Sequence, residues 1–473
     1  MPVTSSNASA LVEYFDAFNA ENENDFKMTY TVPRCGWYHF DGKDCFVDPR
    51  RDCFTTDEDK NISIKVDSQS QFANSLQQVG SLSEWKKAYK LAKKSPVARF
   101  TVSTSVAPPL LKILGERNFL LYITAPTRAG KTTALYLGAS AVGSEKMIRS
   151  FDATKNGLAG AAVDVNDYPF LIDEKQVADH RIKDQLDNLV YALANGIGRT
   201  KLNKDSSLKK IHDWRTIPIM TGETNLLADT VTGGANTRLL TVSAPKIILD
   251  PKTCREIRNS IKENYGFAFP LVINKIVEIG KEKLRKVYNQ LVDVFAEKYP
   301  DVLDEYHRYM AVITLADTLL NSALFGNTVT TDNGSTIKAI DDAIQNAEKI
   351  FALIPTTAET SDTEREKEFV RGFVAQNQNR FEGGNIELDR MQAISGKFEP
   401  IFIYITIAAL KKACAEEGFD YRKLVADLVE AGFFVPSDKV KRDYKKPLAF
   451  VQKKIGKVNT NCYRIRREAF DED

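Results

Sequence analysis

A short stretch in the first third of the chain dictates a strand, a turn and a helix in that order. Residues 119–124 are an apolar run, the small-residue turn 125–130 follows, and Lys131-Thr132 open a helix-forming stretch. The N–H groups of such a turn can surround a polyphosphate, while the lysine reaches the β- and γ-phosphates and the threonine hydroxyl joins a Mg²⁺ shell. The dipole of the next helix points its positive end at the same anion. The pattern therefore predicts an ATP-binding loop (P-loop) within an α/β domain.

The loop departs from the usual pattern, G-x-x-x-x-G-K-[ST], at its first position, where Ala125 replaces glycine. Alanine suits most turn conformations but disfavours a left-handed φ. A chance Gly-Lys-Thr in an ordinary strand–turn–helix is the competing interpretation, and the flanking strand and helix argue against it. The loop residues predicted to contact the nucleotide are Ala125, Pro126, Thr127, Arg128, Ala129, Gly130, Lys131, Thr132 and Thr133.

A second apolar strand ends in two carboxylates. Residues 167–174 read DYPFLIDE, so that Asp173 and Glu174 stand at the end of the apolar run. A carboxylate at a strand's tip can hold hydrated Mg²⁺ while its neighbour polarises the attacking water. We assign Asp173 to the nucleotide-bound metal, together with Thr132, and Glu174 to the general base. Both carboxylates would lie beside Lys131 if this strand and the phosphate-loop strand are neighbours in one parallel sheet, since ligands bind at the carboxyl ends of such strands.

Charge is balanced over the whole chain but not along it. The 473 residues include 65 Lys and Arg against 63 Asp and Glu, so no whole-protein field is aimed at nucleic acid. Residues 1–60 are acidic, whereas residues 438–467 are strongly basic. The six cysteines are scattered, which favours a reducing, cytoplasmic location over a disulfide scaffold. The chain has neither a long apolar run nor a signal-like N-terminus, so we expect no membrane insertion and no secretion.

The order of patterns along the chain predicts four parts. Residues 1–75 alternate short aromatic runs with Gly, Asp and Pro turns, which is typical of a small β-rich domain that serves as a collar or interaction module. Residues 76–250 alternate strands and helices, which indicates a parallel-sheet α/β core. Residues 251–360 carry amphipathic helical periods that suit a lid or linker. In residues 361–473, three helical stretches, one of them 402–418, precede a basic β-ribbon, which is the outline of a winged helix.

Four residues of types that bind metals lie close together near the start of the chain: Cys35, His39, Cys45 and Cys53. They contain no C-x-x-C pair, and their spacing matches no familiar zinc module. Buried thiols within an aromatic core are therefore the better interpretation.

Two basic segments are candidates for contact with a nucleic-acid backbone. Lysines on a hairpin hold phosphates without reading sequence. A solvated surface hairpin and a protein-binding winged helix are the competing interpretations. The first segment, residues 194–214, reverses near Asn203–Ser206 and carries Arg199, Lys201, Lys204, Lys209 and Lys210. The second is the ribbon of the last part, with Lys453, Lys454 and Lys457.

Several segments in a fixed order resemble one helicase family. They are GSLSEWKKAYKLA, the phosphate loop, SFDATKNGLAGAAVDVNDYPFLIDE, VYALANGIGRTK, WRTIPIMTGET and GGANTRLL. Together they resemble the superfamily III/MCM-like (AAA+) replicative helicases of phages and mobile genetic elements, and they are similar to the replication helicases of staphylococcal cassette chromosomes and pathogenicity islands. The resemblance covers residues 30–250 in detail and the winged-helix end more loosely. It implies a hexameric ATPase that encircles DNA.

Matching positions in this resemblance assign further roles to single residues. Thr221, near the end of the strand in residues 214–224, is the expected sensor of the γ-phosphate or of the attacking water. Arg238 is the expected arginine finger, which stabilises charge on the phosphoryl group bound by the neighbouring subunit, and Arg199 is the next candidate. The segment around Lys204 takes the place of the pore loop that holds single-stranded DNA.

These expectations combine into one functional hypothesis. The chain is expected to be an ATPase and DNA helicase that assembles as a homo-hexamer, hydrolyses Mg-ATP between subunits and draws one DNA strand through its pore. The winged helix would hold duplex DNA, and a primase, polymerase or loader would be a further partner. The alternative is an ATP-controlled initiator or DNA-binding switch without processive unwinding. A kinase would need an Arg-rich lid, and no such cluster follows the loop.

Overall fold

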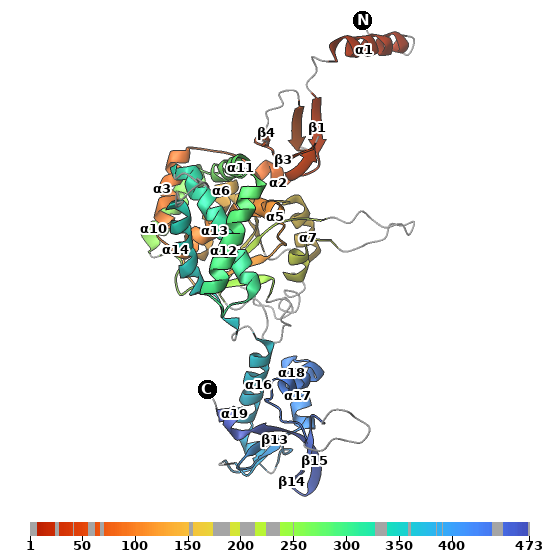
Figure 1. The fold of residues 1–473 in the computed structure, drawn as a ribbon, viewed down its shortest axis with the longest axis vertical. Coiled ribbons are helices and arrows are strands. Elements are labelled where there is room, and N and C mark those ends of the chain that lie inside the picture. The colour runs from red at the N-terminus through yellow and green to blue at the C-terminus, as the bar shows by residue number, and fades with distance from the viewer. Residues whose placement is uncertain are drawn as a thin grey trace. The chain divides into compact units, whose positions relative to one another are not determined.

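The chain forms two compact units by internal contacts (Figure 1). The first comprises Met1–Leu226, Arg238–Pro300 and Asp304–Ile354, and the second is mainly Pro355–Asp473. The computed structural model describes residues 7–23, 28–40, 42–54, 62–66, 71–150, 155–173, 190–198, 213–223, 237–248, 250–326, 338–357, 361–384, 386–389, 391–437 and 448–471.

A five-stranded parallel sheet forms the middle of the first unit. Its strands are β6 (Leu120–Thr124), β7 (Arg149–Ser150), β8 (Phe170–Asp173), β9 (Pro218–Gly222) and β10 (Leu239–Ser243). Their order is β10-β6-β9-β8-β7, and the paired strands are parallel. β6 and β9 are buried along their whole length, as expected of parallel strands that are covered on both faces. The predicted parallel-sheet α/β core is confirmed.

The phosphate-loop strand and the carboxylate strand lie in one parallel sheet but are not direct neighbours. β9 lies between β6 and β8 and pairs with both of them. Parallel strands are joined by long crossover connections, so the order along the chain does not dictate which strands become neighbours. As a result, the carboxyl end of β9 lies between the two strand ends that carry the predicted catalytic residues.

Helices before and after β6 support the phosphate loop. They are α3 (Leu82–Ala92), α4 (Pro96–Ser105), α5 (Pro108–Leu114), α6 (Lys131–Val142) and α7 (Lys155–Asp164). α4 begins with proline at its first position, and Ser95 caps it by accepting from the Ala98 N–H, two signals that favour a helix start. The helix is buried from Val97 to Ser105 and packs against α6.

Short strands dominate the N-terminal part, as predicted. The elements are α1 (Ala8–Asn22), β1 (Met28–Val32), β2 (Gly36–Phe40), β3 (Lys43–Asp48), β4 (Arg51–Phe54), β5 (Ile62–Val66) and α2 (Gln71–Ser75). β1 and β5 form a parallel pair, while β2, β3 and β4 form an antiparallel sheet. The helix α1 is an addition that the strand pattern does not predict.

Aromatic side chains pack the N-terminal strands onto the α/β core. The ring of Phe46 on β3 lies 5.1 Å from that of Trp37 and 5.8 Å from that of Phe269, between centroids. Tyr168, just before β8, stacks on Phe269 at 4.4 Å. All four side chains are buried, and each large apolar side chain contributes about 1.5–3 kcal/mol on burial. The N-terminal strands therefore share a core with the parallel-sheet domain.

A helical region completes the first unit, as predicted. It consists of α10 (Pro251–Glu263), α11 (Ala268–Ile279), α12 (Lys281–Lys298), α13 (Asp304–Phe325) and α14 (Lys338–Phe351). α13 is the most buried of them and packs against α4, α11, α12 and α14. Asp317 of α13 pairs with Arg99 of α4 at 2.6 Å, and both side chains are at most 5% exposed. Among the described residues, no helix is both long and apolar enough to cross a lipid bilayer.

The second unit is a winged helix, as predicted. Its elements are α16 (Asp362–Gln376), β11 (Phe381–Glu382), β12 (Gly396–Phe398), β13 (Phe402–Thr406), α17 (Ile407–Glu417), α18 (Tyr421–Glu430), β14 (Val451–Ile455), β15 (Val458–Arg466) and α19 (Arg467–Asp471). The sheet order is β11-β12-β13-β15-β14. Leu410 of α17, Leu424 of α18 and Ile465 of β15 meet in its buried core.

The predicted helix over residues 402–418 is wrong in its first turn. Residues 402–406 form β13, which pairs with both β12 and β15. The run Phe-Ile-Tyr-Ile-Thr combines aromatic and β-branched side chains, which fit a pleated surface between two strands. The helix begins only after Thr406, whose hydroxyl accepts from the Ala409 N–H as an N-cap.

Candidate nucleotide and DNA-binding sites

The phosphate loop joins β6 to α6 and has the backbone that the motif requires. Gly130 has φ +100°, and a Cβ there would lie 2.9 Å from the Cβ of Ile248. Only glycine therefore fits this position without strain. Arg128 also has a positive φ, of 64°. Ala125 is outside that region, and its N–H donates to the Gly222 carbonyl at 3.2 Å, so alanine is compatible with the first loop position.

The start of α6 supplies donors for an anion. Gly130 is the N-cap, and among the described residues no side chain caps this end. The first N–H groups of a helix have no partner within the helix, and they carry its positive dipole end. Thr132 and Thr133 lie in the first turn, the former half-buried and the latter buried. These features fit a bound phosphate.

The Lys131 side chain lies back over the loop. Its Nζ donates to the carbonyl oxygens of Ala125 at 2.6 Å and Pro126 at 2.9 Å. The same ammonium is 3.5 Å from Oε1 of Glu223, which also accepts from the Thr127 hydroxyl. Glu223 follows β9 by one residue. The sequence indicates Glu223 only by its place after Thr221, and its contacts with the loop come from the structure.

Two further predicted residues meet at the carboxyl ends of neighbouring strands. Asp173 ends β8 and is paired in register with Thr221 of β9. The Thr221 hydroxyl donates to Oδ1 of Asp173 at 3.4 Å, and Thr221 is 2% exposed. Thr221 is in turn in register with Ile123 of β6, next to the loop. Glu174 lies outside the described residues, as do Arg199, Lys201, Lys204, Lys209 and Lys210.

The donor set fits Mg²⁺ bound to a nucleotide. A carboxylate and a hydroxyl are the oxygen ligands that Mg²⁺ takes from proteins in phosphate sites, in addition to water and the phosphates themselves. Asp173 and Thr132 supply one of each. Near the N-terminus, by contrast, Cys35 and Cys45 are buried free thiols, and the described part of the chain has no cluster of three or more His, Cys, Asp or Glu suited to a metal.

Arg238 lies at the opposite end of the sheet from the phosphate loop. It directly precedes β10, and its carbonyl accepts from the Leu120 N–H at the start of β6. The four residue steps along β6 to Thr124 span about 13 Å. The guanidinium lies 5.3 Å from the ring centroid of Tyr191. Because β10 runs parallel to β6, Arg238 is remote from the nucleotide loop of its own chain.

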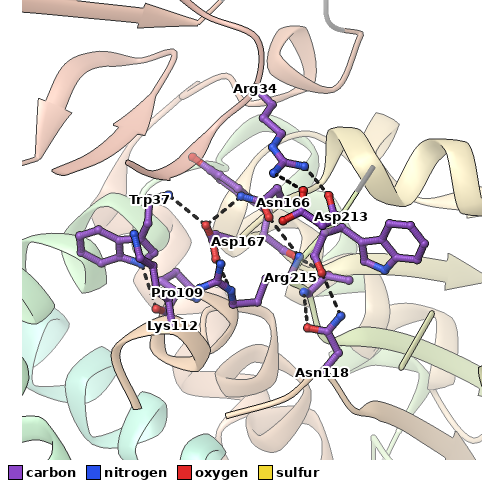
Figure 2. Close-up of polar contacts among 12 residues, drawn as sticks. Arg34, Trp37, Pro109, Lys112, Asn118, Asn166, Asp167, Asp213 and Arg215 are labelled. Atoms are coloured by element: carbon purple, nitrogen blue, oxygen red, sulfur yellow. Dashed lines mark hydrogen bonds and ion pairs between the residues drawn. The ribbon is translucent and has the colours of Figure 1, made fainter. Parts of the chain in front are cut away.

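The described ends of the first basic segment meet at one point. Ile197 and Asp213 form an antiparallel bridge, and the Trp214 N–H donates to the Gly196 carbonyl at 2.8 Å. Arg34, from the turn between β1 and β2, donates to both the backbone and the side chain of Asp213 (Figure 2). The N-terminal part thus contacts Asp213, the residue at which the described part of the chain resumes after residue 198.

The buried carboxylate of Asp167 belongs to the same group of polar contacts (Figure 2). Figure 2 shows Asp167 between Trp37, Asn166 and Arg215. Its Oδ2 accepts from the Trp37 N–H and from the Asn166 amide, both at 2.9 Å, and its Oδ1 lies 3.4 Å from Nε of Arg215. Asp167 is fully buried, and burial raises the pKa of its carboxyl despite Arg215. Sequence reasoning misses this network because its members come from three distant segments.

The wing presents its lysines unequally. β14 and β15 are joined by the two-residue turn Gly456-Lys457, and Gly456 has φ 59°. Lys454 and Lys457 are exposed. Lys453 instead pairs with Glu399 at 2.6 Å and lies 4.6 Å from the ring centroid of Tyr404. Lys453 is thus engaged within the unit.

Two family models match the chain. Residues 1–213 match the model described as "Domain of unknown function (DUF927)", and residues 361–469 match the "Cch helix turn helix domain". No curated protein matches the chain.

Solved structures add a match over nearly the whole length. The structure titled "SCCmec type IV Cch - active helicase" has a TM-score of 0.68 and 20% identity, and the match covers 98% of this chain and 87% of that one. The apo A form of the NrS-1 C-terminal region is 12% identical over 64% of this chain and 77% of that one. Its TM-score is 0.27. At these identities, the first match establishes a shared fold.

Proposed function

Since the chain has the fold of the Cch helicase of a staphylococcal cassette chromosome, we propose that it is an ATP-driven DNA helicase that assembles as a hexameric ring. The observation that carries this proposal is the meeting of three strand ends. The phosphate loop after β6, Thr221 on β9 and Asp173 on β8 lie side by side, as an ATP-hydrolysing site needs. The resemblance of the sequence to replicative helicases of phages and mobile elements supports the same proposal.

In this proposal the loop and its surroundings bind and orient ATP. The N–H groups at the start of α6 and the Lys131 ammonium bind the phosphates, while Thr132 and Asp173 hold Mg²⁺, which neutralises charge on the β- and γ-oxygens when bound. Glu174 accepts a proton from the attacking water. Thr221, buried and linked to Asp173, orients that water or the γ-phosphate.

The position of Arg238 supports a site completed by a second subunit. Arg238 lies at the far end of the sheet from the loop of its own chain, which argues against a role at that loop. In a ring, where heterologous interfaces repeat around the closed circle, it would serve a neighbouring subunit. Arg238 of one subunit would then stabilise the transferring phosphoryl group of the next.

DNA contacts are assigned to two places. We propose that the basic segment that carries Lys204 holds single-stranded DNA in the pore, and that Lys454 and Lys457 on the wing hold duplex DNA through its phosphates. The cytoplasmic location, the four-part domain division and a primase, polymerase or loader as partner remain predictions from the sequence.

The test uses the full-length protein. We expect single-stranded DNA to stimulate ATP hydrolysis, and a forked duplex to be unwound in an ATP-dependent manner. Lys131→Ala should abolish both activities while the melting temperature stays near that of the unsubstituted protein. ATP hydrolysis that ignores DNA, with no unwinding, would contradict the helicase. If Glu174→Gln abolishes hydrolysis yet the protein still supports replication in cells, the ATP-controlled switch is the correct function.

A further inference from the structure

Glu223 contacts two residues of the phosphate loop that are predicted to bind the nucleotide, Thr127 and Lys131. Its Oε1 accepts from the Thr127 hydroxyl and lies 3.5 Å from Nζ of Lys131. The backbone that carries it is held in place, because the neighbouring Gly222 carbonyl accepts from the Ala125 N–H at 3.2 Å. The carboxylate can therefore leave the loop by side-chain rotation while its backbone stays beside the loop.

Three oxygen atoms lie close to the Lys131 ammonium. It has three N–H donors, and two of them are directed at the carbonyl oxygens of Ala125 and Pro126. The Oε1 atom of Glu223 lies 3.5 Å from the same nitrogen. A phosphate oxygen that approaches Lys131 therefore competes with these oxygens. The carboxylate is the one that carries a negative charge, so it is the one that an incoming phosphate repels.

We propose that Glu223 is a carboxylate latch on the phosphate loop: it holds Lys131 and Thr127 where the terminal phosphate belongs and turns away when ATP binds. The proposal rests on the proposed function, because it requires this loop to bind ATP. The latch competes with every anion that approaches Lys131, including the phosphate product. It lowers the affinity of the loop for nucleotide and promotes product release.

The position of Glu223 sets which nucleotide is affected most. The residue follows β9, whose end lies beside Asp173, the proposed metal ligand. The terminal phosphate of ATP extends to this side of the loop, whereas ADP ends one phosphate earlier. Removal of the Glu223 charge therefore increases affinity for ATP more than affinity for ADP.

The test compares nucleotide binding by the full-length protein and by Glu223→Gln, a substitution that keeps size and removes charge. With a fluorescent ATP analogue at low ionic strength, the variant should bind about two- to fivefold more tightly, as expected for one partly exposed ion pair. The gain should disappear at about 0.5 M salt, because screening weakens charge interactions. Glu223→Asp, which keeps the charge, should stay closer to the unsubstituted protein.

Glu145→Gln is the matched control, because Glu145 is an exposed carboxylate beyond the other end of α6. It should leave affinity unchanged. Unchanged or weaker ATP binding by Glu223→Gln would overturn the latch. So would a loss of turnover of a hundredfold or more at unchanged affinity, since Glu223 would then be a catalytic residue.

The proposed function and the latch can fail separately. If ATP binding is lost in Lys131→Ala but unaffected in Glu223→Gln, the loop binds nucleotide and only the latch is wrong. If the protein binds no ATP at all, the proposed function fails and the latch fails with it.

Discussion

Gly130 is the residue of the phosphate loop at which a side chain would disturb the backbone most. Its φ of +100° and the Ile248 side chain against it leave no room for a Cβ. We expect Gly130→Ala to weaken ATP binding by about five- to 150-fold, because strain of about 1–3 kcal/mol would be relieved by moving the loop. Titration with a fluorescent nucleotide measures the effect.

Gly160→Ala is the control for this substitution. Gly160 lies within α7, and among the described residues a Cβ added there would meet no neighbouring atom within 4 Å. Alanine should therefore be neutral or should stabilise the protein by up to about 1 kcal/mol. Equal ATP affinity of the Gly130→Ala variant and the unsubstituted protein would show that the loop does not depend on the left-handed conformation.

A buried glutamate makes the stability of the winged helix depend on pH. Glu366 on α16 is 4% exposed. Burial, reinforced by Asp427, raises the pKa of its carboxyl from 4.5 to about 7. Below pH 4.5 the group is protonated in both the folded and the unfolded state. Between pH 4.5 and 7 only the unfolded state releases the proton, so the free energy of unfolding falls, by at most about 3 kcal/mol.

Glu366→Gln should remove this dependence. At pH 8 the variant should be more stable than the unsubstituted protein, whereas at pH 4.5 the two should be alike. Hydrogen exchange of peptides from α16 in the full-length protein measures this locally. Equal protection of the two proteins at pH 8 would mean that Glu366 is ionised there without cost.

At the scale of single residues, the sequence predicts what is local. The loop residues from Ala125 to Thr133 follow each other directly, and one strand–turn–helix places them all. Glu223 and Asp167 could not be predicted in the same way. Glu223 accepts from Thr127, 96 residues earlier in the chain, and Asp167 accepts from Trp37, 130 residues earlier. No local pattern encodes such contacts.

At the scale of elements, the turn between β1 and β2 contacts Asp213, near the end of the basic segment 194–214. Arg34→Ala would remove the contacts that hold Asp213. Because this loosens only the anchor of the segment, we expect stimulation of ATP hydrolysis by single-stranded DNA to fall about two- to fivefold, in line with the value of one partly exposed pair. Basal hydrolysis should change little. Lys65→Ala, on β5 and exposed, is the control and should leave both rates unchanged.

If Arg34→Ala retains full stimulation by DNA in a steady-state assay, the contact between Arg34 and Asp213 plays no part in DNA binding.

The elements also show where sequence patterns are insufficient. The type of most elements was predictable from periodicity, but strand neighbours were not, since β9 separates β6 from β8. Likewise, the sequence pattern missed β13, because this segment is a strand only through its pairing with β12 on one side and with β15, much later in the chain, on the other.

For the whole molecule, the remote position of Arg238 predicts that hydrolysis depends on assembly. Lys131→Ala and Arg238→Ala should each be inactive alone. When the two variants are mixed in equal amounts, about one ring interface in four joins an intact loop to an intact arginine, and activity should reappear. A mixture that stays inactive, or an Arg238→Ala protein that is active alone, would exclude Arg238 as the finger and leave Arg199 as the next candidate.

The shared aromatic core of the first unit also limits how such a protein can diversify. The aromatic side chains of this core come from both sides of residue 75: Trp37 and Phe46 before it, Tyr168 and Phe269 after it. Recombination at that point would therefore combine aromatic side chains that did not evolve to pack together. The chain after Pro355 has its own hydrophobic core, so recombination near that residue would leave both cores intact. The last quarter of the chain could then be replaced by recombination, while the first three-quarters would be inherited as one piece.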